Sequence, residues 1–268
     1  MGVEEGLPAK MHIKKMVKKI LIIICWLVIW QMLAAAINNP ILIVGPMETI
    51  KTLIRLLPDQ AFCRAVYGTT VMVLSGFLAG WLAGMICASI AYRFRQAREF
   101  LEPVIVFFRA VPIVSFVILL LIWQGSGRLS FLIGFLVVFV VMYGNVLNGL
   151  LGMNDDLVQE AKLLHVSLYR RVRYIYLPEI YPEMKSGLEL AIGMGFKSGI
   201  AAEVIGQPVG SVGNALYQAK IFLQTDEVFA YTLTAICAAW LAEKLLVFLW
   251  SRFFGPKTCE ENSSDKTV

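Results

Sequence analysis

Charged residues are scarce in this sequence. Only 16% of its 268 residues are Asp, Glu, Lys or Arg, whereas 58% are hydrophobic, and the mean hydropathy is +0.71. A soluble domain of this length has too little interior to hide so many apolar side chains, and a disordered chain would be richer in charge. The composition indicates an integral membrane protein. Uninterrupted apolar runs of about 20 residues favour helices over a transmembrane β-barrel, whose strands alternate apolar and polar residues.

Residues that build metal sites and enzyme active sites are also few. The five cysteines stand singly without a CxxC pair, and the two histidines, His12 and His165, are far apart. This pattern supports neither a disulfide framework nor a metal site. Asp155, Asp156 and Glu160 form the only acidic cluster that a membrane-embedded enzyme could use, without histidine support. The chain also lacks the G-x-x-x-x-G-K-[ST] motif of ATP-binding loops. We therefore expect no enzymatic activity, no metal and no cofactor bound by this chain.

Six apolar runs are long enough to cross a hydrocarbon core of about 30 Å, which takes roughly 20 helical residues. They cover residues 20–37, 66–92, 104–123, 131–149, 186–205 and 228–250. The expected fold is all-α and multi-pass: a basic segment at 1–19, one transmembrane domain over 20–250 and a polar tail at 251–268. The first run could instead be a cleaved signal peptide, because basic residues precede it and three alanines at 34–36 resemble a cleavage site. Its length exceeds the usual span of about 7–15 residues, which favours a retained helix.

The distribution of basic residues predicts the orientation of these helices. With the N-terminus in the cytoplasm, sixteen of the 24 lysines and arginines fall on the cytoplasmic side and five on the opposite side. Cationic segments are retained on the cytoplasmic side during insertion. Both termini are therefore predicted to be cytoplasmic. The same distribution accounts for the net charge of +5, so no nucleic-acid partner is expected.

The run at 66–92 carries a stripe of glycines. Gly76, Gly80 and Gly84 are spaced four residues apart, which places them along one side of a helix. Such a stripe lets the backbone of a neighbouring helix approach closely. We expect a helix-packing surface here and consider a pore lined by bare backbone the less favoured alternative.

The longest polar segment inside the chain is 151–185, between the fourth and fifth runs. Charged and apolar residues alternate there at helical spacing, which predicts an amphipathic helix. Asn154 or Asp155 could cap its start, and Ser167 could cap a second short helix after a turn near His165. From periodicity alone, the segment could equally be an interfacial loop whose cations contact lipid phosphates.

This segment resembles the loop that defines the membrane subunits of bacterial ABC importers. That loop reads Glu-Ala-Ala, three residues, Gly, nine residues and Ile-x-Leu-Pro. The matching positions here are Gln159, Glu160, Ala161, His165, Ile175, Leu177 and Pro178. The spacing is kept, but Gln replaces the Glu, Glu replaces the first Ala and His replaces the Gly. Because Gly adopts a positive φ at little cost and His at more, we expect the turn to be altered at His165.

The resemblance extends over nearly the whole chain from about residue 43, and it is strongest to permeases of the nitrate, sulfonate and taurine importer group. Further matching stretches are 108–112 (Phe-Arg-Ala-Val-Pro), 157–167, 187–203 and 210–213 (Gly-Ser-Val-Gly). The resemblance implies a multi-pass permease of the bacterial cytoplasmic membrane that works as a homodimer or with a second, different permease copy.

The resemblance also implies partners and a solute. The partners are a cytoplasmic ATPase dimer, which binds ATP and Mg²⁺ and docks at the 151–185 loop, and an extracytoplasmic solute-binding protein. The solute is a small anion such as nitrate, a sulfonate or taurine, or else a pyrimidine vitamin precursor. A stand-alone secondary carrier is the alternative, although such carriers usually have more helices and internal repeats.

Two charges in the run at 186–205 are candidates for the translocation path. A lysine near the middle of a span, such as Lys197, costs roughly 2.5–3.5 kcal/mol on insertion scales and needs a partner or a wet cavity. Lys197 therefore either faces the path, where it could attract an anion, or pairs with Glu203 or another acid. For Glu203 itself, close to the end of the run, we favour a place at the polar interface over one in an outer gate.

Two further candidates lie in the run at 104–123. Arg109 is near enough to its start for the long side chain to reach the cytoplasmic surface. Pro112 is expected to kink the helix, because proline removes one backbone donor. The kink could serve gating, although a static bend is the favoured interpretation.

Overall fold

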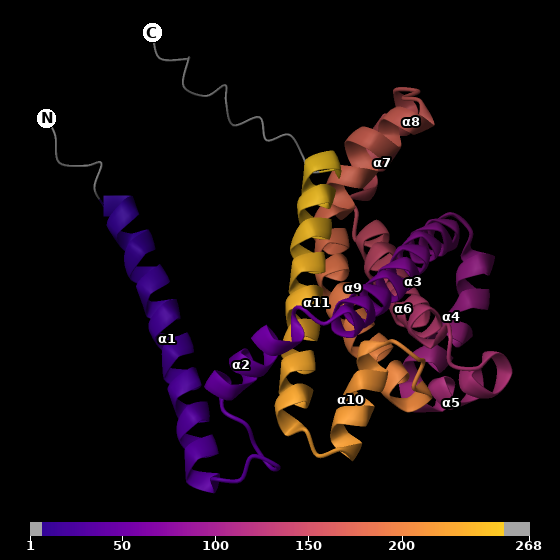
Figure 1. Cartoon of the computed structure of the whole chain (residues 1–268). Coiled ribbons are helices and arrows are strands. Elements are labelled where there is room, and N and C mark those ends of the chain that lie inside the picture. Colours follow the sequence, from indigo (N-terminus) through magenta and orange to yellow (C-terminus); the bar gives the residue numbers. More distant parts are fainter. Residues whose placement is uncertain (1–6, 255–268) are drawn as a thin grey trace, which may run out of the picture. The chain divides into compact units, whose positions relative to one another are not determined.

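The structure is a computed structural model that describes residues 7–254. Within this part of the chain every regular element is a helix (Figure 1). The helices are α1 (Leu7–Ile37), α2 (Pro46–Leu56), α3 (Gln60–Arg93), α4 (Arg95–Ala110), α5 (Ile113–Gln124), α6 (Leu129–Leu151), α7 (Asp155–Leu163), α8 (Leu168–Arg171), a π-helical stretch (Val172–Tyr176), α9 (Leu177–Gly206), α10 (Val212–Ile221) and α11 (Thr225–Phe254). The predicted basic segment 1–19 and polar tail 251–268 fall partly outside the described residues.

The predicted all-α, multi-pass fold class is confirmed. Four predicted runs lie inside single helices, α1, α3, α6 and α11, that are long and apolar enough to cross a membrane. The run at 186–205 lies inside α9, which carries Glu189, Lys197 and Glu203 in that half. By length and composition the described chain therefore has four candidate spans, or up to five if the bent pair α4 and α5 counts as one.

The expectation of one kinked helix over 104–123 is wrong, because the chain breaks there. Helix α4 ends at Ala110, α5 starts at Ile113, and the two axes differ by 99°. Pro112 has no backbone N–H, and its ring disfavours the helical conformation at the preceding residue. Val111 is accordingly extended, with φ −75° and ψ 130°. The proline thus produces a turn between two helices instead of a bend within one.

The chain divides into two compact units, one of residues 1–63 and 215–233 and the other of residues 64–214 and 234–268. In the first unit, α2 follows α1 after a short connection. The Trp30 indole of α1 donates a hydrogen bond to the Val44 carbonyl at 3.0 Å, and its ring lies 5.6 Å from that of Phe229 at the start of α11. Phe62 and Tyr231 form a second aromatic pair at 5.1 Å. Aromatic contacts of this kind thus connect the helix ends of this unit.

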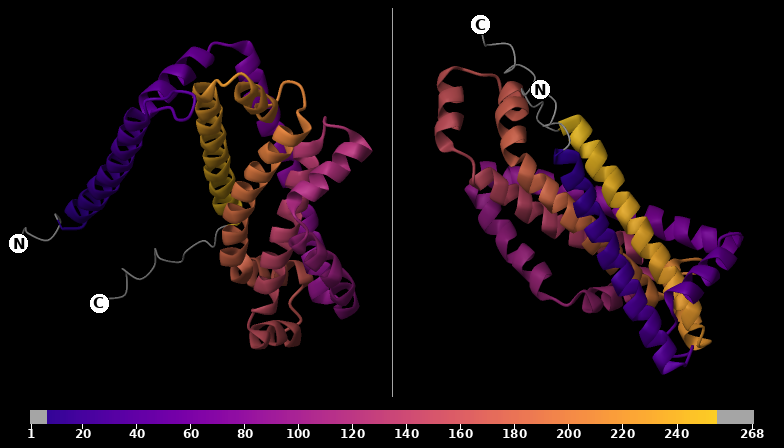
Figure 2. Two further views of the ribbon diagram at one scale, coloured as in Figure 1. Left: turned by 90° about the horizontal axis from the view of Figure 1, so that it is seen from below. Right: turned by 90° about the vertical axis from the view of Figure 1, so that its left-hand side faces the viewer.

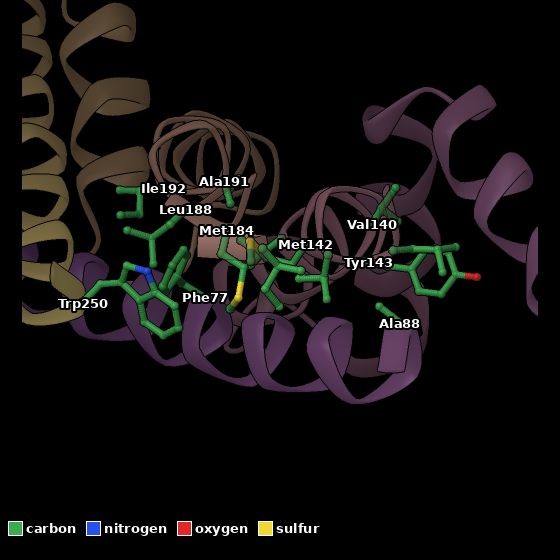
Figure 3. Packing of buried hydrophobic residues seen from close by; sticks show 14 of the residues in the cluster. Phe77, Ala88, Val140, Met142, Tyr143, Met184, Leu188, Ala191, Ile192 and Trp250 are labelled. Atoms are coloured by element: carbon green, nitrogen blue, oxygen red, sulfur yellow. The ribbon is translucent and has the colours of Figure 1, made fainter. Parts of the chain in front are cut away.

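The core of the second unit forms where α3, α6 and α9 meet (Figure 3). Phe77 of α3, Met142 of α6 and Leu188 of α9 are each at most 3% exposed. The rings of Trp81 and Trp250 meet edge to face at 5.5 Å and extend this core to α11. Figure 2 shows the same helices in two further views.

The glycine stripe of α3 packs directly on α6. A methyl group at Gly76 or Gly80 would overlap the carbonyl oxygen of Phe131 or Phe135, and one at Gly84 would press on α6 about 3 Å away. Backbones in such close contact gain dispersion energy along their whole length. The stripe therefore fixes how closely α3 approaches α6.

Candidate functional site

An open cavity of about 360 Å³ lies in the second unit where the break between α4 and α5 faces α6 and α9. Most of its lining is aliphatic or aromatic. The polar side chains that line it are Arg109, Asn145 and Asn148. A few polar groups in an otherwise apolar concavity are typical of small-molecule sites.

Arg109 reaches this cavity because of two sequence features. It stands in the last turn of α4, immediately before the break that Pro112 imposes. Its guanidinium rests against Gly144 of α6, where a β-carbon would overlap the Nη2 atom. A side chain at position 144 would therefore displace the guanidinium. Arg109, which we expected to extend towards the cytoplasmic surface, is here part of a cavity wall.

Asn145 and Asn148 contribute the amide groups of the cavity. The Asn145 amide donates to the Val141 carbonyl of its own helix at 2.9 Å, which fixes the side chain along α6. Asn148 is exposed. The sequence analysis did not single out these two residues, although polar side chains within an apolar run often line a substrate path or site.

Lys197 stands on the exposed side of α9. Leu190 and Met194 of this side line the cavity, and Lys197 follows Met194 by three residues, which places both on the same side of the helix. Its side chain is exposed and forms no ion pair with any residue that the structure describes. The alternative in which Lys197 pairs with Glu203 is therefore not the arrangement seen.

Glu203 is buried, contrary to the interfacial position that the sequence favoured. It is 2% exposed. One carboxylate oxygen accepts a hydrogen bond from the Ser130 hydroxyl at 2.6 Å, and the other accepts bonds from the Thr69 hydroxyl at 2.8 Å and the Gly213 N–H at 3.1 Å. Three donors compensate much of the cost of burying a carboxylate. The error arose because two of these donors, Thr69 of α3 and Ser130 of α6, are far from Glu203 in sequence.

The carboxylate of Glu203 also organises the start of α10. Thr69 accepts a bond from the Val212 N–H at 3.0 Å while it donates to Glu203, so two N-terminal N–H groups of α10 bond to this pair. A negative group is favoured at a helix N-terminus, where N–H groups lack helical partners. Gly213 lies so close to the Glu203 backbone that a β-carbon would overlap it. Glu203 thus links α9 to α3, to α6 and to the start of α10.

Helices α7 and α8 extend beyond the ends of α6 and α9 (Figure 1). The Asn154 side chain caps α7 by accepting a bond from the Asp156 N–H at 2.9 Å. Ser167 holds the cap position of α8 but makes no side-chain cap bond. Gln159 and Glu160 are exposed and Ala161 is buried. Ile175 in the π-helical stretch and Leu177 at the start of α9 are half-buried, and Pro178 is exposed.

His165 forms the turn between α7 and α8 with a left-handed backbone, φ +53°. The Val166 N–H donates to the Ala161 carbonyl at 3.0 Å, a bond typical of a helix that ends in a left-handed residue. The expected alteration of the turn is therefore not seen, because His165 adopts the left-handed conformation that a glycine would adopt most easily. Leu163 and Leu164 beside the turn are each 78% exposed.

Comparison with known proteins places these features in a family. The family model described as "Binding-protein-dependent transport system inner membrane component" matches residues 76–258. A probable ABC transporter permease protein of Haemophilus influenzae is 25% identical over 252 residues, which cover 88% of this chain and 98% of its own. The taurine transport system permease protein TauC of Escherichia coli is 25% identical over 220 residues, 80% of each chain.

A solved structure shows the same fold. A chain of the inward-facing MetNI methionine ABC transporter superposes with a TM-score of 0.56 at 16% identity, over 70% of this chain and 94% of that chain. The family match covers well over half of the sequence, and its members and these relatives are membrane-embedded transport permeases, not enzymes. This chain therefore belongs to the family of binding-protein-dependent transport system inner membrane components.

Proposed function

We propose that this chain is the permease subunit of an ATP-driven importer and that the cavity beside the α4–α5 break lies on the path of a small anionic solute. The lining of this cavity supports the proposal. Its polar side chains are Arg109, Asn145 and Asn148, and no carboxylate lines it. A guanidinium with neighbouring amide donors suits nitrate or a sulfonate group.

Lys197 supports the choice of an anion over an uncharged solute such as a pyrimidine vitamin precursor. It adds a second cation on the side of α9 that borders the cavity, and no described acid neutralises it by an ion pair. A cation in a poorly hydrated path attracts anions more strongly than it would in water. The relationship to a taurine permease is consistent with this class of solute.

Helices α7 and α8 are the proposed contact with a separate cytoplasmic ATPase. Large apolar side chains are left exposed there, among them Leu163, Leu164 and Tyr169, each 78% exposed. Exposed apolar clusters of this kind mark protein interfaces. The ATPase dimer would hold ATP and Mg²⁺, and a rigid helix pair would transmit its motion to α6 and α9. The complete importer would also contain a second permease copy and an extracytoplasmic binding protein, with both termini of this chain in the cytoplasm.

The proposal is tested by replacing Glu160 with Lys in the complete importer reconstituted in vesicles. Glu160 is exposed on α7, so the variant should assemble and hydrolyse ATP, but uptake of taurine or nitrate per ATP should fall about tenfold, a change of about 1.4 kcal/mol in coupling. Glu102→Lys, a matched charge reversal at an exposed position of α4 outside the 151–185 loop, should leave the ratio unchanged. Full uptake by the Glu160 variant would remove the coupling role from this helix pair.

A further inference from the structure

Helix α2 exposes a stripe of large apolar side chains and buries two threonines, unlike a helix that covers a soluble core with its apolar stripe. Met47, Ile50, Ile54 and Leu57 are between 48% and 62% exposed, whereas Thr49 and Thr52 are 1% and 7% exposed. The four apolar residues recur at helical spacing and form one continuous stripe. An exposed apolar stripe of this length calls for an apolar partner.

The buried threonines show how α2 is held to the rest of the first unit. The Thr49 hydroxyl donates to the Gly45 carbonyl at 3.0 Å, and the Thr52 hydroxyl donates to Asp226 at the start of α11 at 2.9 Å. Arg55 approaches Asp226 at 3.1 Å and Glu227 at 3.6 Å. These bonds fix the rotation of α2 about its own axis. The apolar stripe is therefore held on the outside and cannot turn inward.

Charged residues occupy a third side of α2. Glu48, Lys51 and Arg55 are exposed and project between the apolar stripe and the buried threonines when the helix is viewed along its axis. Helix α2 thus has a protein-facing, an apolar and a charged side. This division is what a helix requires when it lies at a membrane surface against a protein, with one side in acyl chains and one in water.

The connection to α1 brings α2 to the end of a membrane span. Residues Met16–Ile37 of α1 form a candidate span of which only 6% is buried, so lipid is the natural surrounding of this helix. Trp30 near its end bonds to Val44, and the Gln31 side chain packs on Gly45, the residue before α2. Ile41 and Leu42 in the connection are 51% and 69% exposed. The apolar surface of α1 therefore continues through the connection onto α2, which lies at a clear angle to α1 (Figure 1).

We propose that α2 is an interfacial helix whose stripe of Met47, Ile50, Ile54 and Leu57 is embedded in the bilayer at the end of α1. Lipid acyl chains are its partner, and Lys51 is placed to contact lipid phosphates, because its side chain is exposed and forms no ion pair with a described residue. Burial of an apolar stripe in the interface anchors α2, and through Thr52 and Arg55 it anchors the first turn of α11.

The test uses the full chain with its five cysteines replaced by alanine, reconstituted in vesicles of phosphatidylethanolamine and phosphatidylglycerol. A spin label is placed at Ile54→Cys and, as the matched control on the same helix, at Lys51→Cys. Oxygen partitions into acyl chains, whereas a nickel chelate stays in water. The ratio of oxygen to nickel accessibility should be several-fold higher at position 54 than at position 51.

Two results would overturn the proposal. High nickel accessibility at position 54 would place the stripe in water, available to a soluble partner. Low accessibility to both reagents would mean that protein, such as a second copy of the chain, covers it. A second measurement needs no substitution: a photoactivatable phospholipid should label residues 47–57 of the unaltered chain as it labels α1. Labelling of α1 without α2 would also contradict the proposal.

Discussion

Lys197 and Glu203 stand on the same helix, α9, in opposite surroundings. Glu203 is 2% exposed and accepts hydrogen bonds from two hydroxyls and a backbone N–H. Lys197 is exposed and forms no ion pair with a described residue. Each charge lies in the apolar run at 186–205, where a charged side chain is costly in free energy unless it has a partner or water. The structure assigns to one a packing role and leaves the other available to a ligand.

The two sides of α9 differ because of the residues around each charge. Gly195, Ser198 and Gly199 are buried and small, so α9 lies close to α6 and α3; a β-carbon at Gly199 would come within 2.8 Å of the Val73 side chain. This close approach brings the donors of Thr69 and Ser130 to Glu203. Leu190 and Met194 beside Lys197 line an open cavity instead. A charge within the apolar run of α9 is thus buried or exposed according to the side chains on its own side of the helix.

Replacement of Glu203 by Ala should have the largest effect on stability. The substitution leaves the hydroxyls of Thr69 and Ser130 and the Gly213 N–H buried without their acceptor, which should lower the free energy of unfolding by about 3 kcal/mol or more. Unfolding in mixed micelles measures the change. Glu189→Ala, on the exposed side of the same helix, is the matched control and should cost about 0.5 kcal/mol or less. Equal losses in the two variants would contradict the contrast between the sides of α9.

Replacement of Gly199 by Val should have the next largest effect. The added side chain meets Val73 on the buried side of α9, and overpacking of this kind costs about 1–3 kcal/mol. Gly193→Val changes the same residue type on the same helix, at a position with open space around it, so it controls for helix propensity. If both variants melt at the same temperature, the close packing of α9 is not what stabilises it.

Lys197→Met is expected to lower uptake without changing stability. Loss of the exposed cation should reduce initial uptake of taurine or nitrate in the reconstituted importer about tenfold, the equivalent of about 1.4 kcal/mol. Lys197→Arg keeps the charge and should retain most of the uptake. A loss of stability with unchanged uptake kinetics would instead assign Lys197 the same structural role as Glu203.

Asn154→Ala, at the start of the helix pair α7 and α8, should have the smallest effect on stability. It removes the side-chain acceptor of the Asp156 N–H, and loss of such a cap costs about 1 kcal/mol. Hydrogen exchange should therefore speed up in the first turn of α7 and stay unchanged in α9. Exchange that speeds up throughout α9 would show that the helix pair is not a separately stabilised element.

The sequence predicted the elements that depend on local composition. The apolar runs, the Asn154 cap and the turn at His165 follow from residues within one or two helical turns of each other. The sequence predicted a kink at Pro112 where the structure has a complete break between two helices. A proline within an apolar run indicates both. The burial of Glu203 and the cavity around Arg109 could not be predicted, since they depend on Thr69, Ser130 and Gly144 from other helices. Helix α2 was missed because its apolar stripe is too short to stand out as a run.

Whether this chain works as an importer subunit is decided by purifying it in mild detergent from its own membranes and determining the mass of the intact complex by mass spectrometry. We expect two ATPase subunits for every two permease chains, and loss of the ATPase alone when Leu163→Asp or Leu164→Asp is introduced on the exposed side of the helix pair. A chain that purifies without an ATPase and still transports taurine or nitrate in vesicles would be a stand-alone carrier and not an importer subunit.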